Sequence, residues 1–219
     1  MVVNKPSGLV VHSDGRTKEK TLADWVLENY PETENVGEPI IKTNGEKILR
    51  PGIVHRLDRD TSGVMLIAKN KESFENLKEQ FKNHTIIKKY ETFVFGVVKD
   101  KEGIINRPIT RSKSDFRKWS AQRGGRGEPR EALTKYKVIL ENNDYSFLEV
   151  MPETGRTHQI RVHMKFLNHP VVCDSLYNPD NPCPKNISRM ALHAKSIEFK
   201  NLNGKIIKIE SKLPKFFPK

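Results

Sequence analysis

The chain has 219 residues, a length that fits one large domain or two small ones and that can bury a sizeable core without disulfide or metal staples. Charged residues make up 30% and hydrophobic residues 36%, and no run approaches the roughly 18 apolar residues of a membrane-spanning helix. Small disulfide-knotted scaffolds and transmembrane proteins are therefore excluded. The formal charge of +12 favours a polyanionic partner such as nucleic acid, although excess lysine also serves solubility.

Three segments have the periodicity of helices. Residues 22–30 carry apolar side chains on one face, with Thr21 and Asp24 placed to cap the first turn. Residues 71–83 form a second amphipathic pattern with Asn70 as its cap. Residues 157–167 form a third, ended by Asn168 before a proline. Arg161 lies beside the apolar stripe of the third helix, so a buried role requires an anionic partner from elsewhere in the chain.

Strand patterns outnumber the helices. They cover residues 64–68, 90–98, 133–140 and 145–151, and a hairpin with an Asn203-Gly204 turn. Short connections between neighbouring strands predict the α+β class. We expect a single domain, residues 1–219, with a central mixed, largely antiparallel sheet flanked by a few helices.

The segments between these elements, residues 31–52, 111–130 and 174–187, are predicted to be long loops. Residues 111–130 carry seven Lys or Arg against two acidic residues, interleaved with Phe116 and Trp119. This mixture suits phosphates and bases, and we weigh an RNA clamp against a flexible basic loop. The two cysteines, Cys173 and Cys183, match no paired zinc spacing. We expect them to be structural, without a disulfide, in a cytoplasmic protein.

The densest group of polar residues runs from His55 to Gly63 and leads directly into the apolar strand at 64–68. Loops held by a rigid sheet are where catalytic groups concentrate. Asp, Thr and Ser in such a loop can equally cap backbone groups. The loop alone does not decide between these two interpretations.

Two further segments settle the interpretation. They are Asn4-Lys5-Pro6-Ser7-Gly8-Leu9, near the start, and the run from Gly155 to His163 on the third helix. With HRLDRDTSG at 55–63 they form a triplet, in this order, that resembles the hallmark segments of RluA-type pseudouridine synthases. The resemblance covers essentially the whole chain, including Lys88-Lys89-Tyr90 and residues 190–194.

The resemblance implies a role for individual residues. Asp58 matches the aspartate that attacks the target nucleotide, Tyr90 the tyrosine that stacks on the uracil, and Arg161 the arginine that pairs with the catalytic carboxylate. Arg56 matches the arginine that enters the RNA helix as the target base leaves. For Lys5 the family suggests a role in shaping the site, against a plain strand-edge lysine. The other residues expected to contact substrate are Arg59, Thr61, His158 and Ile160.

The implied reaction explains these residue types. Converting uridine to pseudouridine breaks the bond from N1 to C1′ and joins C5 to C1′, with no redox step. A carboxylate can add to C1′ or act as a base that lets the sugar form a glycal, and either route requires an ionised Asp58. The base must leave the stack, at a cost of a few kcal/mol, before the reaction. Strand alternation puts Tyr90 and Thr92 on one face and Phe93 and Phe95 on the other.

Other functions fit less well. A metal hydrolase using His55, Asp58, His158 and His163 lacks the i, i+4 histidine pair that shares a zinc. Ser62 has no GxSxG elbow for acyl transfer. A non-catalytic RNA-binding module is the main alternative, but it gives no reason for a carboxylate in a phosphate-facing cleft.

The chain departs from the usual family pattern in a few places. The chain starts almost inside the first hallmark, so it either lacks a preceding strand or is naturally minimal, and it contains no S4-type RNA-binding domain. Cys173 and Asn178 stand where the family usually has glycine, which puts local turns in doubt. We expect a monomer that acts on a ribosomal or transfer RNA stem-loop in a basic cleft, without membrane, metal or cofactor.

Overall fold

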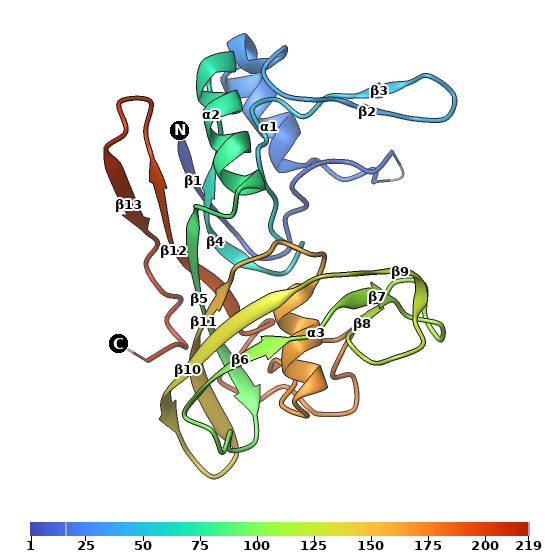
Figure 1. Cartoon of the computed structure of the whole chain (residues 1–219), viewed down its shortest axis with the longest axis vertical. Coiled ribbons are helices and arrows are strands. Elements are labelled where there is room, and N and C mark those ends of the chain that lie inside the picture. Colours follow the sequence, from blue (N-terminus) through green and yellow to red (C-terminus); the bar gives the residue numbers. More distant parts are fainter. Residues whose placement is uncertain (16, 219) are drawn as a thin grey trace. The chain divides into compact units, whose positions relative to one another are not determined.

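The computed structural model describes residues 1–15 and 17–218, whose contacts divide the chain into two compact units (Figure 1). Unit 1 comprises Met1–Ile87 and Ser196–Ser211, and unit 2 comprises Lys88–Lys195 and Lys212–Lys219. The second division falls within one strand, β12 (Leu192–Lys200).

The two helices of unit 1 begin where their local sequence predicts. Helix α1 (Leu22–Asn29) opens with a reciprocal capping box, in which the Thr21 hydroxyl accepts from the Asp24 amide and the Asp24 carboxylate accepts from the Thr21 amide. Helix α2 (Lys71–Lys82) is capped by Asn70, whose Oδ1 accepts from the Ser73 amide at 2.9 Å. Both predicted caps are confirmed.

The strands of unit 1 pair antiparallel. Strand β4 is buried along its whole length, and its neighbour β1 pairs with it in a register that sets Lys5 opposite Gly63. A short 3₁₀ helix, η1, and the hairpin β2–β3 occupy the predicted loop at 31–52 (Figure 1). Strand β13 pairs with Ser196–Lys200 of β12. Gly204 turns this predicted hairpin at φ +74°, in the region that favours glycine. The bounds are β1 (Val2–Lys5), η1 (Pro31–Thr33), β2 (Ile40–Ile41), β3 (Lys47–Ile48), β4 (Ser62–Leu66) and β13 (Ile206–Glu210).

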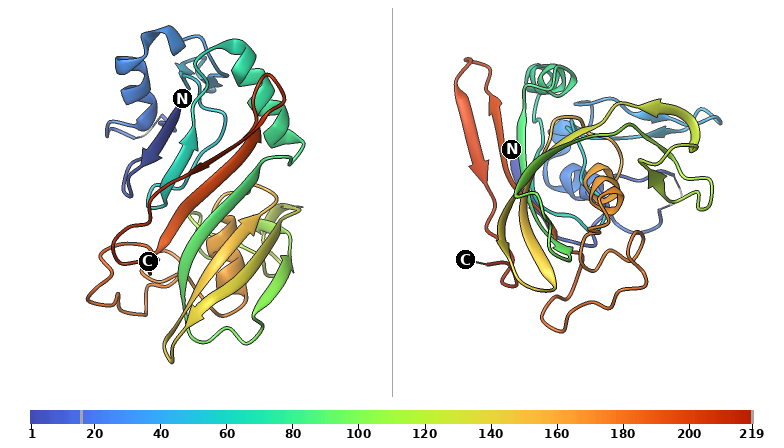
Figure 2. Two further views of the ribbon diagram at one scale, coloured as in Figure 1. Left: turned by 90° about the vertical axis from the view of Figure 1, so that its left-hand side faces the viewer. Right: turned by 60° about the horizontal axis from the view of Figure 1, so that its bottom comes forward.

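Unit 2 is built on an antiparallel sheet in the order β5-β11-β10-β6, covered on one face by helix α3 (Figure 2). Ile160 and Met164 of α3 join the buried apolar cluster formed by the strands. Asn168 follows the helix at φ 62°, a left-handed residue that ends it as predicted. The bounds are β5 (Ile87–Phe95), β6 (Glu102–Asn106), β10 (Leu133–Glu141), β11 (Tyr145–Pro152) and α3 (Gln159–Phe166).

The basic segment is ordered as a second, smaller sheet of unit 2. Strands β7 (Ile109–Arg111), β8 (Trp119–Ser120) and β9 (Arg126–Arg130) pair antiparallel in the order β8-β7-β9. The prediction of a loop across 111–130 is therefore wrong. The strands of this sheet are only two to five residues long. They contain arginine and glycine in place of alternating apolar residues, so no strand pattern is visible in the sequence.

The expectation about the cysteines is also wrong, because Cys173 and Cys183 form a disulfide with their Cα atoms 5.0 Å apart. The predicted loop at 174–187 returns on itself between them, which spacing alone does not reveal.

The α+β class with largely antiparallel pairing is confirmed. Among residues 1–15 and 17–218, we found no helix with the length and apolar character needed to cross a bilayer.

Candidate active site

The first hallmark segment and the Asp58 loop are held together within unit 1. Lys5 is 1% exposed, and its Nζ donates to the carbonyls of Pro6, Leu9 and Arg59 at 2.9, 2.7 and 2.8 Å. The Gly8 amide donates to the Arg59 carbonyl at 2.9 Å, while Arg59 Nε donates back to the Gly8 carbonyl at 3.2 Å. Lys5 is the last residue of the edge strand β1, but it is a buried brace between two loops and not a solvent-facing edge lysine.

Asp58 lies on this braced loop just before β4. Its neighbours Leu57 and Thr61 are buried, at 4% and 3% exposure, and the Thr61 amide donates to the Asp58 carbonyl at 3.2 Å. Asp58 itself is half-buried. The loop is anchored on both sides of the carboxylate, which fixes where that side chain starts.

The two arginines beside Asp58 are exposed. Arg56 Nη1 lies 3.4 Å from Nε2 of His12, whose Nδ1 donates to the Ser13 carbonyl at 3.0 Å. Burial lowers the pKa of His12, so its ring is neutral and Nε2 accepts the Arg56 bond. Arg59 forms an ion pair with Glu19 at 3.0 Å. The neutral His12 ring thus orients Arg56, while Arg59 is held at the surface by its ion pair with Glu19.

In unit 2, the turn before α3 is framed by Gln159, a residue that the sequence argument overlooked. Its Oε1 accepts from the Thr154 hydroxyl at 2.7 Å and the Arg156 amide at 3.0 Å. Its Nε2 donates to the Leu133 carbonyl at 3.0 Å and the Thr134 hydroxyl at 2.9 Å. Gln159 lies inside the hallmark run from Gly155 to His163, but nothing in that run shows which backbone groups its amide would bind.

Arg161, on the first turn of α3, is 5% exposed and has the anionic partner that its position requires. Asp174 accepts from Nε at 2.6 Å and from Nη2 at 2.9 Å, and is itself 1% exposed. This bidentate pair fixes the plane of the guanidinium. Asp174 was not among the predicted site residues.

Tyr177 links Arg161 to His158. The Tyr177 hydroxyl lies 2.9 Å from Nδ1 of His158 and accepts from the Trp119 amide of β8 at 2.9 Å. The Arg161 guanidinium stacks on the Tyr177 ring, 5.0 Å from its centroid. His158 has a left-handed backbone, with φ 58°, at the start of α3. A predicted substrate contact and the predicted catalytic arginine therefore share one tyrosine.

Tyr90 is half-buried on β5, opposite Val150 of β11, and packs against the cluster that contains Ile160. Thr92 shares that face and is fully buried, whereas Phe93 packs in a different cluster, so the predicted alternation is confirmed. Ile160 is only 6% exposed. Two residues before Tyr90, burial lowers the pKa of Lys88 to about 8.

His163 serves the core rather than a metal. It is fully buried, with Nδ1 2.8 Å from the Thr134 hydroxyl and Nε2 3.0 Å from the Arg107 carbonyl. Burial lowers its pKa, which keeps the ring neutral. Within the described part of the chain, no three His, Cys, Asp or Glu side chains are grouped to hold a metal ion.

The basic segment, residues 111–130, spans most of the small sheet β8-β7-β9 and the connections between its strands. The Arg111 guanidinium stacks 4.5 Å from the Trp119 ring centroid, and Phe116 is 76% exposed. Arg117 binds the carboxylate of Asp115 at 2.8 Å, and this bond lowers the pKa of Asp115 to about 2. All five residues of β9 are exposed. The sheet therefore offers cations and aromatic faces to solvent.

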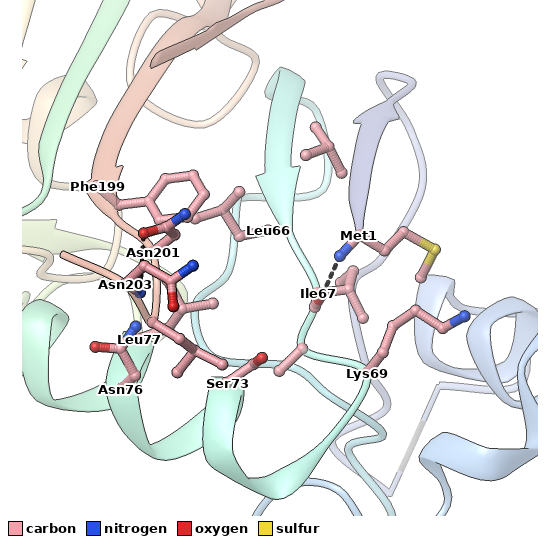
Figure 3. Close-up of a pocket in the computed structure, with 13 residues that line it drawn as sticks. Met1, Leu66, Ile67, Lys69, Ser73, Asn76, Leu77, Phe199, Asn201 and Asn203 are labelled. Carbon is pink, nitrogen blue, oxygen red and sulfur yellow. Dashed lines mark hydrogen bonds between the residues drawn. The ribbon is translucent and has the colours of Figure 1, made fainter. Parts of the chain in front are cut away.

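A hollow of about 440 Å³ lies elsewhere in unit 1, beside β1 and α2 (Figure 3). The Met1 ammonium donates to the Ile67 carbonyl at 2.8 Å on its wall, and Asn76 and Asn201 face it. Its described lining contains no carboxylate or histidine and none of the predicted site residues. The polar groups on its lining are the Met1 ammonium and the side chains of Lys69, Ser73 and three asparagines.

Residues 1–166 match the family model described as RNA pseudouridylate synthase, a span that includes the braced Asp58 loop and Arg161. The chain belongs to this family. The resemblance to RluA-type synthases is thereby confirmed. The members of this pseudouridine synthase family are isomerases that act on RNA.

An uncharacterized RNA pseudouridine synthase of Synechocystis is 36% identical over 223 residues, covering 100% of this chain and 64% of the relative. Ribosomal large subunit pseudouridine synthase D of Borreliella burgdorferi is 38% identical, covering 99% of this chain and 63% of the relative. The chain thus spans a little under two thirds of these curated relatives. The solved structure of human RNA pseudouridylate synthase domain containing 1 has a TM-score of 0.73 at 25% identity, covering 97% of this chain and 79% of that one.

Proposed function

We propose that this protein isomerises a specific uridine in structured RNA to pseudouridine. The Asp58 loop carries the proposal. Lys5 holds this loop by a hydrogen bond to the Arg59 carbonyl, and both lie inside the segment that matches the family model. A carboxylate on a loop anchored at both flanks starts from a fixed position, as nucleophilic or base catalysis at C1′ requires.

In this proposal Asp58, Arg161 and Tyr90 act on the same nucleotide. The N1–C1′ bond breaks, the C5–C1′ bond forms, and the hydrogen on C5 leaves as a proton. Asp174 holds the Arg161 guanidinium in a fixed plane, which supports its role as the charged partner of the Asp58 carboxylate. Tyr90 stacks on the uracil, and Arg56 fills the space that the flipped base leaves.

Around these three groups, Lys5 shapes the loops, while Arg59, Thr61, His158 and Ile160 line the substrate-binding segments. Arg59 is best suited to phosphate because it is exposed, while the buried Thr61 and Ile160 support the backbone around them. The enzyme acts as a monomer in the cytoplasm, in a basic cleft and without a metal or cofactor. One catalytic domain spans residues 1–219.

Large-subunit ribosomal RNA is the substrate to test first, because relatives at 36–38% identity carry the name ribosomal large subunit pseudouridine synthase D. Transfer RNA is the second. Stem-loop shape selects the uridine, since paired RNA exposes little sequence in its deep major groove.

The experiment measures tritium release from transcripts of bacterial large-subunit ribosomal RNA and of transfer RNA labelled at uridine C5. Joining C5 to C1′ displaces that hydrogen, so wild-type protein should release tritium and Asp58→Asn should release none. Asp60→Asn is the matched control, because Asp60 lies on the same loop and its carbonyl accepts from the Ser7 hydroxyl at 2.7 Å. Asp60→Asn should keep most of the activity.

Measuring RNA affinity beside turnover distinguishes a synthase from a non-catalytic binding module. A synthase keeps its affinity when Asp58 becomes Asn, whereas turnover disappears. If wild-type protein binds both RNAs tightly and releases no tritium from either, the binding module is the better description.

We also propose that the sheet β8-β7-β9 clamps RNA. The exposed Phe116, between β7 and β8, and the Trp119 ring of β8 offer stacking surfaces beside arginines that carry the charge for phosphate. An ordered basic sheet supports a clamp better than a flexible loop, because its side chains are already held near their binding positions.

A further inference from the structure

The disulfide Cys173–Cys183 closes a loop whose first residue after the bridge is Asp174. Cys183 is an exposed residue and Cys173 is half-buried, so the Cys183 side of the bridge is the side nearer to solvent. Exposed disulfides are the ones that thiols reach and exchange with. The bridge is therefore chemically accessible while its neighbour Asp174 is buried.

Asp174 is fixed on two sides. Its Oδ1 accepts from the amides of Leu176 and Tyr177, each at 3.0 Å, and both of its oxygens hold Arg161. The loop conformation thus sets where the carboxylate lies, and the carboxylate sets the plane of the guanidinium. A change in the loop conformation would therefore move the Asp174 carboxylate and with it the Arg161 guanidinium.

Tyr177 transmits the same loop conformation to two other places. Its hydroxyl contacts His158 and accepts from the Trp119 amide of β8. The loop therefore ties together the start of α3 and the edge of the basic sheet. Both belong to the RNA-facing machinery proposed above.

Cys173 occupies a backbone conformation that does not suit it. Its φ is 60°, in the left-handed region where a side chain with a Cβ is strained and glycine is favoured. A cysteine at such a position indicates that its sulfur is used, since glycine removes the strain. The disulfide gives that use.

We propose that the Cys173–Cys183 bridge is a redox-sensitive clasp, which sets how firmly Asp174 and Tyr177 position Arg161 and His158. Its catalytic consequence rests on the proposed function. In the reduction, a thiolate of a dithiol attacks the exposed Cys183 sulfur and breaks the S–S bond. The second thiol then closes the dithiol into its own disulfide, so two electrons and two protons end on the cysteines. Asp174 and Tyr177 are positioning residues in this scheme.

The first test follows hydrogen exchange in the full chain, oxidised or reduced with dithiothreitol, with the thiol state checked by mass spectrometry. The clasp predicts that the amides of Leu176, Tyr177 and Trp119 exchange roughly tenfold faster after reduction. The Ser73 amide, which caps α2, is the internal control and should not change. In Cys183→Ser the three amides should exchange rapidly with or without dithiol.

The second test measures tritium release. Reduction should lower kcat by roughly three- to tenfold while KM for the RNA stays within twofold, because Arg161 acts on the reaction more than on binding. Cys183→Ser should show the low kcat under both conditions. Asp174→Asn should show the same split between kcat and KM, with partial recovery in Asp174→Glu. A thermal melt of each variant checks that it is folded, and an unfolded Asp174 variant leaves the Cys183→Ser comparison to decide.

Unchanged exchange at Leu176, Tyr177 and Trp119 after complete reduction overturns the clasp, as do two free thiols in protein isolated under oxidising conditions. Equal kcat in both redox states overturns its catalytic part. Absence of tritium release in either state contradicts the proposed function instead, and the exchange experiment still decides the clasp.

Discussion

Lys5 shows how one charged side chain organises a site. Because its ammonium donates to three partly buried carbonyls while 1% exposed, Lys5→Met removes three charge-assisted bonds at once. We expect the variant to lose about 3 kcal/mol of unfolding free energy, measured in urea. Lys18→Met changes an exposed lysine and should stay within about 0.5 kcal/mol. A loss below about 1 kcal/mol for Lys5→Met would contradict its role as a brace.

His193 predicts sensitivity to acid. Burial, with the charges of Arg189 and Lys195, lowers the pKa of His193 from 6.5 to about 4. Below pH 6.5 the unfolded chain takes up a proton that the folded chain refuses, so stability falls as the pH drops from 6.5 to 4. The total loss is about 3 kcal/mol. Urea unfolding at pH 7 and pH 4.5 should show a smaller difference in His193→Gln than in wild type, while the exposed His84→Gln should match wild type.

The sequence predicts that Arg161 needs an anionic partner, and the structure supplies Asp174. It does not predict which residue, since the pairing depends on how the chain returns after α3. The same holds for Gln159, whose Nε2 makes two bonds that reach across to β10. Motifs point to the residues that are expected to react, whereas the residues that hold them in place appear only once the chain is folded.

Among the elements, those set by local sequence were predictable. The caps of α1 and α2 involve residues three positions apart, so the sequence contains the whole interaction. The sheet β8-β7-β9 was missed because its pairs join Arg111 to Arg126 and to Trp119, without an apolar pattern on any strand. The disulfide was missed because a loop rich in Asn and Pro brings the cysteines together.

That disulfide should also contribute to stability. A cross-link between residues ten positions apart lowers the entropy of the unfolded chain, which raises the free energy of unfolding by about 2 to 3 kcal/mol. We expect Cys183→Ser to melt about 5 to 10 °C below the oxidised wild type. Reduced wild type should melt with the variant, which separates the cross-link from the loss of a side chain. Equal melting temperatures for oxidised and reduced wild type would show that the loop holds without its bridge.

For the whole molecule, charge predicts the partner better than it predicts the binding surface. The formal charge of +12 favours nucleic acid, and family membership now agrees with that expectation. Seven of the 39 Lys and Arg residues lie in 111–130, and others cover α2 and the β12–β13 hairpin. Net charge alone therefore does not say which face meets RNA.

Salt dependence separates these faces. Each phosphate contact contributes about −0.7 to −0.9 to the slope of log affinity against log salt. If the small sheet clamps RNA, replacing the seven Lys and Arg of residues 111–130 by Gln should make the slope shallower by about 2 to 3, as three or four lost contacts require. A control with seven lysines of α2 and the β12–β13 hairpin replaced has the same net charge. A long-range effect of charge would make the slope shallower by the same amount in both variants. A clamp makes it shallower only when the basic sheet is neutralised.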